Sequence, residues 1–417
     1  MSRYRQPLQA GRYSGVTLTF PSIDFDDFHT VELPARIAAG NGALAAPDLT
    51  RVGTLGISVP DGGAYTYVPA PDTIEIWPGE AAADTMVEMS REAFSDFANE
   101  LRTYFGLLYA SMVEVTRGDF GWFERWEPAL RALYHGRPII DPTVVVKRSD
   151  LDRSFSLDDS DADLSSFLGD LGYLHVRGVL QPDEIAALDA EVERQRADAR
   201  PDDGRSWWAT RADGTDVCCR VIYLGERSPD IAVLGDDPRL RRLAALGGAD
   251  LVPEVDCLDG QSVVIKHPEI TAGLSDLPWH RDCGLGGHPV LCPSVAIGIQ
   301  LDRASADTGQ LHFLAGSHLG SSHPLHPADE EHQPVVAIDT EPGDVPVHFG
   351  HVMHAAPPPK GEGACRRALY VTYARPETMA FVGPGNGYND VLFEHDGQVH
   401  SVDELRDPVA TELPTEA

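Results

Sequence analysis

The chain has 417 residues, and its 65 acidic and 33 basic residues give a formal net charge of −32. This length allows about two domains with a substantial core, and a surface so acidic, without clustered Lys and Arg, excludes nucleic acid and anionic membranes as expected partners. No run reaches the roughly 18 to 20 apolar residues of a membrane helix and the N-terminus lacks the apolar centre of a signal peptide, so we expect a soluble cytoplasmic protein without membrane insertion.

Residues 1–146 are predicted to form an N-terminal α+β domain. Strand-like runs such as "YSGVTLTF" alternate with a helical segment in which Phe94, Phe97, Leu101, Phe105 and Leu108 recur at three- and four-residue spacing, as on one apolar helix face. The order of a strand ending "ADTMVEMS", a helix and a strand ending "VTRGDF" resembles the sterol carrier protein fold over residues 80–120. That resemblance implies a cavity for an apolar ligand, whereas an ordinary aromatic core is the alternative.

Residues 147–166, "KRSDLDRSFSLDDSDADLSS", are charged, rich in serine and without apolar periodicity, so they are predicted to be a linker. The second domain, residues 167–417, begins with a helix and the strand "GYLHVRGVL". Pro182 then starts a helix on which Ile185, Leu188 and Val192 share one face.

Short apolar runs separated by Gly, Pro and Asp dominate the second domain beyond about residue 215. They include "CCRVIYL", "QSVVIKH", "SVAIGIQLD", "GQLHFLAGSH", "DVPVHF" and "RALYVTYA". Many short strands with turn signals between them are typical of a β-sandwich, jelly roll or small barrel, so the overall class is α+β. The six cysteines form no disulfide framework and no paired zinc pattern, and reduced thiols are expected.

The stretch "LPWHRDCGLGG" places a histidine and an aspartate two positions apart, at His280 and Asp282. Residues i and i+2 at a strand end project to the same side, so both side chains can converge on one ion. Two histidines and one carboxylate on one face of an iron ion leave three positions for a cosubstrate and oxygen. The pattern is weak alone, because His267 and Glu269 form a second such triplet.

A third metal ligand is offered by "GDVPVHFGHVMHAAPPP", which contains His348, His351 and His354. Either Arg366 or Arg367 follows on the strand "RRALYVTYA". A guanidinium fork binds a carboxylate through two hydrogen bonds and always keeps its charge, which suits a dicarboxylic cosubstrate.

The order of "GYLHVRGVLQPDEIAAL", "WHRDCG", "TGQLHFLAGSH", "EPGDVPVHFGHVMHAAPP" and "RRALYVTYA" is similar to the phytanoyl-CoA dioxygenase family of Fe(II)- and 2-oxoglutarate-dependent oxygenases, over about residues 165–375. The resemblance implies a double-stranded β-helix, a cupin-like jelly roll, with Fe(II), 2-oxoglutarate and O2 as cofactors. By position, it implies iron binding by His280, Asp282 and His354 and cosubstrate binding by Arg366. Strand alternation gives a conflicting indication for the arginine. Arg367 shares its face with the apolar Leu369 and Val371, so the pattern alone would not choose Arg366.

Other residues near these motifs carry two interpretations each. Lys266 lies on a strand leading toward the metal site, where it either contacts the cosubstrate or is a surface lysine. Trp279 either walls the substrate pocket or belongs to the core. His312 and His318 are expected to be structural, as are His267 and Glu269.

The expected activity is hydroxylation of an aliphatic C–H bond, because Asp282 occupies the position at which radical halogenases carry a small residue. Desaturation or cyclisation stays open, as does the oligomeric state. Two other classes are a cupin-like metalloenzyme without 2-oxoglutarate and a lipid-binding protein with an inactive barrel. The N-terminal domain favours a small, apolar substrate of lipid, sterol, terpenoid or polyketide type.

Overall fold

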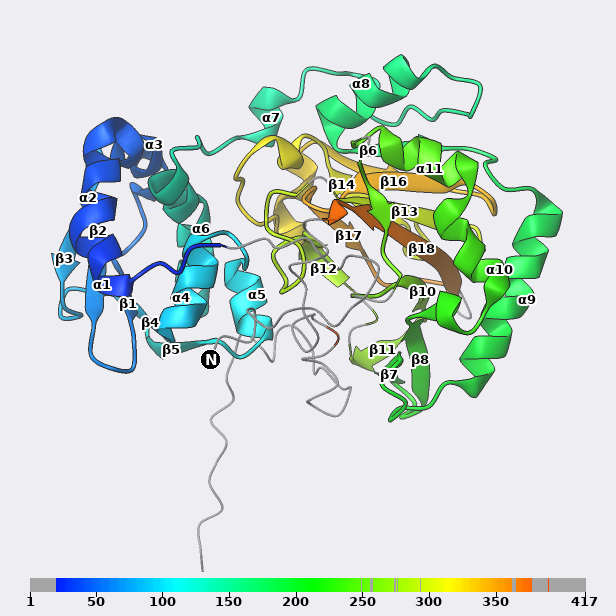
Figure 1. Cartoon of the computed structure of the whole chain (residues 1–417), viewed down its shortest axis with the longest axis horizontal. Coiled ribbons are helices and arrows are strands. Elements are labelled where there is room, and N and C mark those ends of the chain that lie inside the picture. Colours follow the sequence, from blue (N-terminus) through cyan, green and yellow to red (C-terminus); the bar gives the residue numbers. More distant parts are fainter. Residues whose placement is uncertain are drawn as a thin grey trace, which may run out of the picture.

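The computed structural model describes residues 20–248, 250–255, 258–273, 275, 277–292, 294–361, 365–376 and 389. Two hydrophobic cores organise them. One core extends from Phe25 to Tyr134, and the other extends from Phe155 to Tyr373. Figure 1 shows the smaller N-terminal unit beside the larger β-sheet unit. No helix in this part of the chain is long and apolar enough to span a membrane.

The N-terminal unit is a mixed five-stranded sheet with helices packed against it. The strand order is β3-β2-β1-β4-β5, with β1 and β4 parallel. Its strands are β1 (Leu55–Ser58), β2 (Ala64–Ala70), β3 (Thr73–Pro78), β4 (Thr85–Met89) and β5 (Val113–Arg117). Its helical elements are α1 (Phe25–Asp27), η2 (Phe28–Glu32), α2 (Leu33–Arg36), η3 (Ile37–Asn41), α3 (Gly42–Ala45), η4 (Ala46–Leu49), α4 (Arg91–Ala98), α5 (Tyr104–Tyr109) and α6 (Phe120–His135).

The predicted single apolar helix through residues 94–108 is wrong, because the chain breaks it into α4 and α5. Glu100 has a left-handed backbone (φ 58°), which an α-helix does not tolerate, and the Thr103 side chain accepts a hydrogen bond from the Gly106 amide and starts a new helix. Phe94 and Phe97 are therefore buried on α4, while Phe105 turns toward the other unit. Of the predicted strand-like run "YSGVTLTF", residues 13–19 lie outside the described residues.

Part of the predicted linker at residues 147–166 has regular structure. Ser160 accepts a hydrogen bond from the Asp163 amide, so α8 (Asp161–Leu171) already begins at Asp161. Phe155 is buried in the second core and pairs with Val176. The segment after α7 (Pro142–Val145) is thus packed against the second unit rather than free.

The second unit consists of two antiparallel sheets, as expected for a double-stranded β-helix. The large sheet has the order β11-β7-β8-β10-β18-β13-β16-β6, with β9 also paired to β18, and the small sheet has the order β12-β17-β14-β15. The strands are β6 (Tyr173–Val176), β7 (Ser206–Arg211), β8 (Asp216–Val221), β9 (Val252–Pro253), β10 (Gln261–Lys266), β11 (Ile270–Ala272), β12 (Leu277–His280), β13 (Val295–Gln300), β14 (Leu311–Leu314), β15 (Val335–Ile338), β16 (Val345–Phe349), β17 (His354–Ala356) and β18 (Arg366–Ala374).

Helices cover the outer side of the large sheet (Figure 1). The predicted helix after Pro182 is confirmed as α9, whose Ile185, Leu188 and Val192 are buried. Glu184 accepts a hydrogen bond from the Gln181 amide (2.8 Å) and so stabilises the first turn of α9. The remaining helical elements are α9 (Pro182–Asp198), η5 (Leu224–Glu226), α10 (Pro229–Ala232), η6 (Val233–Asp236), α11 (Pro238–Ala245), η7 (Ser317–Leu319) and η8 (Pro327–His332).

The two units meet where α5 touches the loop that follows Asp282. The Thr103 amide donates to the carbonyl oxygen of Gly284 (2.9 Å), and the Val290 amide donates to that of Glu100 (2.8 Å). Further along the interface, His323 Nε2 lies 2.6 Å from Asp48 Oδ1. The N-terminal unit is therefore positioned directly against the loop that carries Asp282.

Gly106 on α5 allows this close approach, since a Cβ atom there would clash with the Gly284 carbonyl oxygen. We expect Gly106→Ala to lower the free energy of unfolding by about 1–3 kcal/mol, because the backbone of the loop must move. Gly169 on α8 is exposed and has open space around it, so Gly169→Ala should raise stability slightly by helix propensity. Chemical denaturation of both variants measures the difference; equal behaviour would contradict a tight contact at Gly106.

Candidate active site

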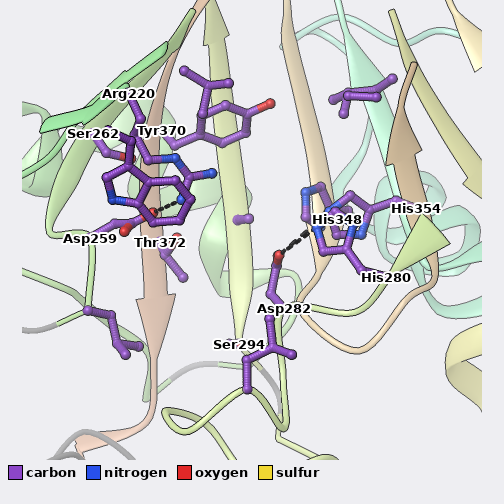
Figure 2. Close-up of a pocket in the computed structure, with 18 of the residues that line it drawn as sticks. Arg220, Asp259, Ser262, His280, Asp282, Ser294, His348, His354, Tyr370 and Thr372 are labelled. Carbon is purple, nitrogen blue, oxygen red and sulfur yellow. Dashed lines mark hydrogen bonds and ion pairs between the residues drawn. The ribbon is translucent and has the colours of Figure 1, made fainter. Parts of the chain in front are cut away.

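His280, Asp282 and His354 lie together at neighbouring ends of the small sheet (Figure 2). His280 ends β12, His354 begins β17, and the two residues pair across these strands. Asp282 Oδ1 lies 3.5 Å from His280 Nε2 and 3.6 Å from His354 Nε2. One ligand atom from each residue falls within 4.8 Å of the other two, which is the separation that a shared metal ion requires.

Backbone carbonyl groups orient both histidine rings. His280 Nδ1 donates to the carbonyl oxygen of Pro278 (2.7 Å), and His354 Nδ1 donates to that of Val352 (3.1 Å). A proton held at Nδ1 leaves the Nε2 lone pair available, and Nε2 is the atom that faces Asp282 in each ring.

The electrostatics of this cluster match the protonation states of metal ligands. Enclosure opposes ionisation of Asp282, but the adjacent His354 and His280 hold the pKa of its carboxyl well below its usual range. Burial lowers the pKa of His354 to about 3 in spite of Asp282, and burial likewise lowers the pKa of His348. An ionised carboxylate and neutral imidazoles are the forms that bind a cation.

The other two histidines of the "HFGHVMH" segment have different surroundings. The ring of His348 lies beside that of His354, with 4.4 Å between the centroids and 40° between the ring planes, but it does not join the three-residue cluster. His351 lies beside His318 and Phe349, away from that cluster. Of the three histidines in this segment, the structure thus brings His354 to His280 and Asp282.

Arg366 and Arg367 point to opposite sides of β18. Arg366 is 1% exposed, lines the cavity, and has no carboxylate within ion-pair distance in the described part of the chain. Its Nη1 donates a long hydrogen bond to Gln300 Oε1 (3.4 Å), and its Nε atom is buried without a partner among these residues. Arg367 instead forms an ion pair with Asp302 (2.8 Å) on the outer side of the large sheet.

The structure explains why strand alternation along β18 did not point to Arg366. Leu369 and Val371 are fully buried, but they contribute to the core between the large sheet and its covering helices. The side of β18 that faces the cavity carries Arg366, Tyr370 and Thr372. Both sides of the strand are enclosed, so an apolar pattern alone could not identify the cavity side.

Lys266 is fully buried in the cavity wall, so its interpretation as a surface lysine is wrong. It pairs directly with Arg366 across β10 and β18, which places both side chains on the same face. Lys266 Nζ donates to the carbonyl oxygens of Ser275 (2.8 Å) and Ala356. Two basic side chains therefore lie next to each other in one buried wall.

Trp279 does not line the cavity, so the interpretation of Trp279 as a residue of the substrate pocket is wrong. Alternation along β12 sends Pro278 and His280 into the cavity and Trp279 to the other side, where it packs with Leu314 and Met353. Its Nε1 atom donates to Glu330 (2.8 Å).

Two histidines outside the site contact backbone carbonyl groups. His318 Nε2 lies 3.0 Å from the Gly169 carbonyl oxygen, and His267 Nε2 lies 3.0 Å from the Cys218 carbonyl oxygen. Both contacts are of the structural kind that was expected for these residues.

Several cavity residues were not predicted from the sequence. Figure 2 shows Arg220, Asp259 and Tyr370 on the wall of the cavity opposite His280, Asp282 and His354. The side chains of Arg220 and Asp259 form an ion pair with 2.7 Å between Nη1 and Oδ2. The N-terminal unit contributes two aromatic side chains to the lining from α5. Apart from the metal cluster, Arg366 and Lys266, the wall includes Phe105, Tyr109, Trp207, Arg220, Leu258, Asp259, Leu285, His348, Tyr370 and Thr372.

Two antiparallel sheets, a cluster of two histidines and one aspartate, and a buried arginine within one cavity define the class of non-haem Fe(II) oxygenases. The model of the phytanoyl-CoA dioxygenase family matches residues 170–368. This part of the chain therefore belongs to that family, and the protein is an Fe(II)- and 2-oxoglutarate-dependent oxygenase. No such support was found for the sterol carrier resemblance of the N-terminal unit, and no curated protein matches the chain significantly.

Solved structures similar to this chain include AviO1 from Streptomyces viridochromogenes Tue57, with 28% identity, a TM-score of 0.41, and coverage of 52% of this chain and 96% of AviO1. The non-heme alpha-ketoglutarate-dependent carbocyclase SnoK from nogalamycin biosynthesis has 23% identity, a TM-score of 0.43, and coverage of 54% and 87%. EctD from S. alaskensis with bound Fe has 20% identity, a TM-score of 0.43, and coverage of 57% and 83%.

Proposed function

We propose that this oxygenase hydroxylates an aliphatic C–H bond of a small, apolar substrate, with 2-oxoglutarate and O2 converted to succinate and CO2. The observation that supports the site is the convergence of His280, Asp282 and His354 in one cavity with the buried Arg366. Asp282 completes the metal cluster, and this disfavours halogenation, which needs room for a halide at that position.

In this proposal the three clustered residues hold Fe(II), and Arg366 binds the distal carboxylate of 2-oxoglutarate. Bound iron and cosubstrate supply the oxidation of an otherwise unreactive C–H bond. The chain provides geometry: the carbonyl groups of Pro278 and Val352 fix the two imidazole rings, and Lys266 adds positive charge beside Arg366. The two sheets and α5 surround the cavity that holds the reacting groups.

The aromatic part of the wall supports an apolar substrate. Phe105 and Tyr109 from α5 meet Trp207 of β7 around the cavity, and Leu258 and Leu285 add aliphatic surface. Large apolar side chains around a few polar groups are typical of pockets for small organic ligands. This arrangement also gives the N-terminal unit a role in shaping the active site.

The proposal is tested by screening sterols, terpenoids, polyketides and fatty acids for succinate formation above the substrate-free rate and for a product that gains one oxygen atom. Once a substrate is found, we expect Phe105→Ala to raise its KM by about tenfold through lost apolar contact. The variant should leave 2-oxoglutarate binding unchanged. Trp122→Ala, which removes an exposed aromatic side chain of α6, is the control. Preferred turnover of charged, polar compounds would contradict the proposed substrate class.

A further inference from the structure

A second group of metal-binding side chains lies in the loop that follows Asp282. Cys283, His288 and Cys292 are all buried, and one ligand atom from each lies within 4.8 Å of the other two. The two sulfur atoms are 3.3 Å apart. This cluster shares no residue with the group formed by His280, Asp282 and His354.

Glu254 adds a fourth side chain from a distant part of the sequence. Its Oε1 lies 2.7 Å from His288 Nε2, and the two residues are 2% and 4% exposed. The two side chains therefore form a buried ion pair in direct contact. A carboxylate in this position orients the imidazole ring, as carboxylates beside metal-binding histidines do.

We propose that Cys283, Cys292 and His288 bind a zinc ion, separate from the iron site, with Glu254 held against His288. Thiolate and imidazole are the ligands of zinc sites of mixed Cys/His type. Two sulfur atoms bound tetrahedrally to one zinc ion at about 2.3 Å lie about 3.8 Å apart. The sulfur pair therefore needs to open by only about half an ångström, whereas a disulfide needs the sulfur atoms at about 2.05 Å.

The position of the cluster suggests what the ion does. Cys283 follows Asp282 directly, and its amide donates to the carbonyl oxygen of Gly350 (3.0 Å). Glu254 extends β9, and its amide donates to the carbonyl oxygen of Thr372 on β18 (2.8 Å). An ion bound here links the loop to the large sheet. The bound ion would thereby hold in place the backbone next to Asp282, which is also the backbone that α5 of the N-terminal unit contacts.

The test is the metal content of the purified full-length protein, measured by plasma mass spectrometry after incubation with Zn(II) and removal of unbound ion. We expect about two zinc ions per chain, because Zn(II) also fills the iron site. The zinc that shows sulfur neighbours in the X-ray absorption spectrum, as in a mixed Cys/His site, should persist in His280→Ala, which removes an iron ligand. It should be lost in Cys292→Ser and in His288→Gln, but not in Cys219→Ser, which changes a buried cysteine elsewhere.

Three results would overturn the proposal without touching the oxygenase assignment. One is the absence of bound zinc from the folded wild type. Another is zinc that has only nitrogen and oxygen neighbours and disappears in His280→Ala, because that ion would occupy the iron site. The third is a covalent bond between Cys283 and Cys292, seen as a peptide lighter by two hydrogens. The wild-type absorption spectrum keeps the test decisive even if a cysteine variant fails to fold.

Discussion

Arg366→Ala is expected to weaken 2-oxoglutarate binding roughly 100-fold, because two charge-assisted hydrogen bonds of about 1.5 kcal/mol or more each are lost. Arg366 is buried in the cavity wall, and the described chain offers its guanidinium no carboxylate of its own. A dicarboxylic cosubstrate is the anionic partner that we propose for this side chain. Arg366→Lys should recover only part of the affinity, since a point charge cannot replace a planar fork.

The measurement needs no substrate. Anaerobic titration with Fe(II) and then 2-oxoglutarate should give the weak visible charge-transfer band of a chelated keto acid in the wild type. Arg367→Ala is the matched control, because it removes the same side chain from the outer face, where Arg367 pairs with Asp302. Loss of the band in Arg367→Ala but not in Arg366→Ala would reverse the assignment. A wild type that binds metal without any band would contradict the proposed cofactor site.

His354→Ala is expected to lower the affinity for Fe(II) by more than about 100-fold, since even the loss of a residue that only orients a ligand costs about 10–100-fold. The imidazole supplies one of three protein donors, and its Nδ1 atom is already committed to the Val352 carbonyl. Iron binding under anaerobic conditions, measured by equilibrium dialysis, gives the affinity directly.

Two further histidine variants sharpen this experiment. His312→Ala removes a partly buried imidazole that lies outside the cluster, and it should retain full iron binding. His348→Ala should also retain most of the affinity, because the His348 ring lies beside that of His354 without joining the cluster. If His348→Ala abolished iron binding while His354→Ala did not, the choice between the two histidines would be wrong.

The local elements and the residue types of the site could be predicted from the sequence. Short apolar runs between turn residues located most strands of the large sheet, and the Pro182 signal located α9, because these patterns reflect burial on a nearby surface. The spacing of His280 and Asp282, and their resemblance to a known family, identified the chemistry. Local pattern failed at residues 99–103, where a left-handed Glu100 and the Thr103 cap divided one apolar stripe between two helices.

Only the tertiary structure decided which side chains share a cavity. Alternation could not choose between Arg366 and Arg367, because sheets and helices enclose both faces of β18. The contribution of Phe105 to the active-site wall depends on how α5 docks, which involves residues about 180 positions apart, such as Thr103 and Gly284. The approach of Glu254 to His288 likewise comes from the pairing of distant strands. Sequence patterns report local burial, whereas contacts between distant segments are set by the packing of the whole chain.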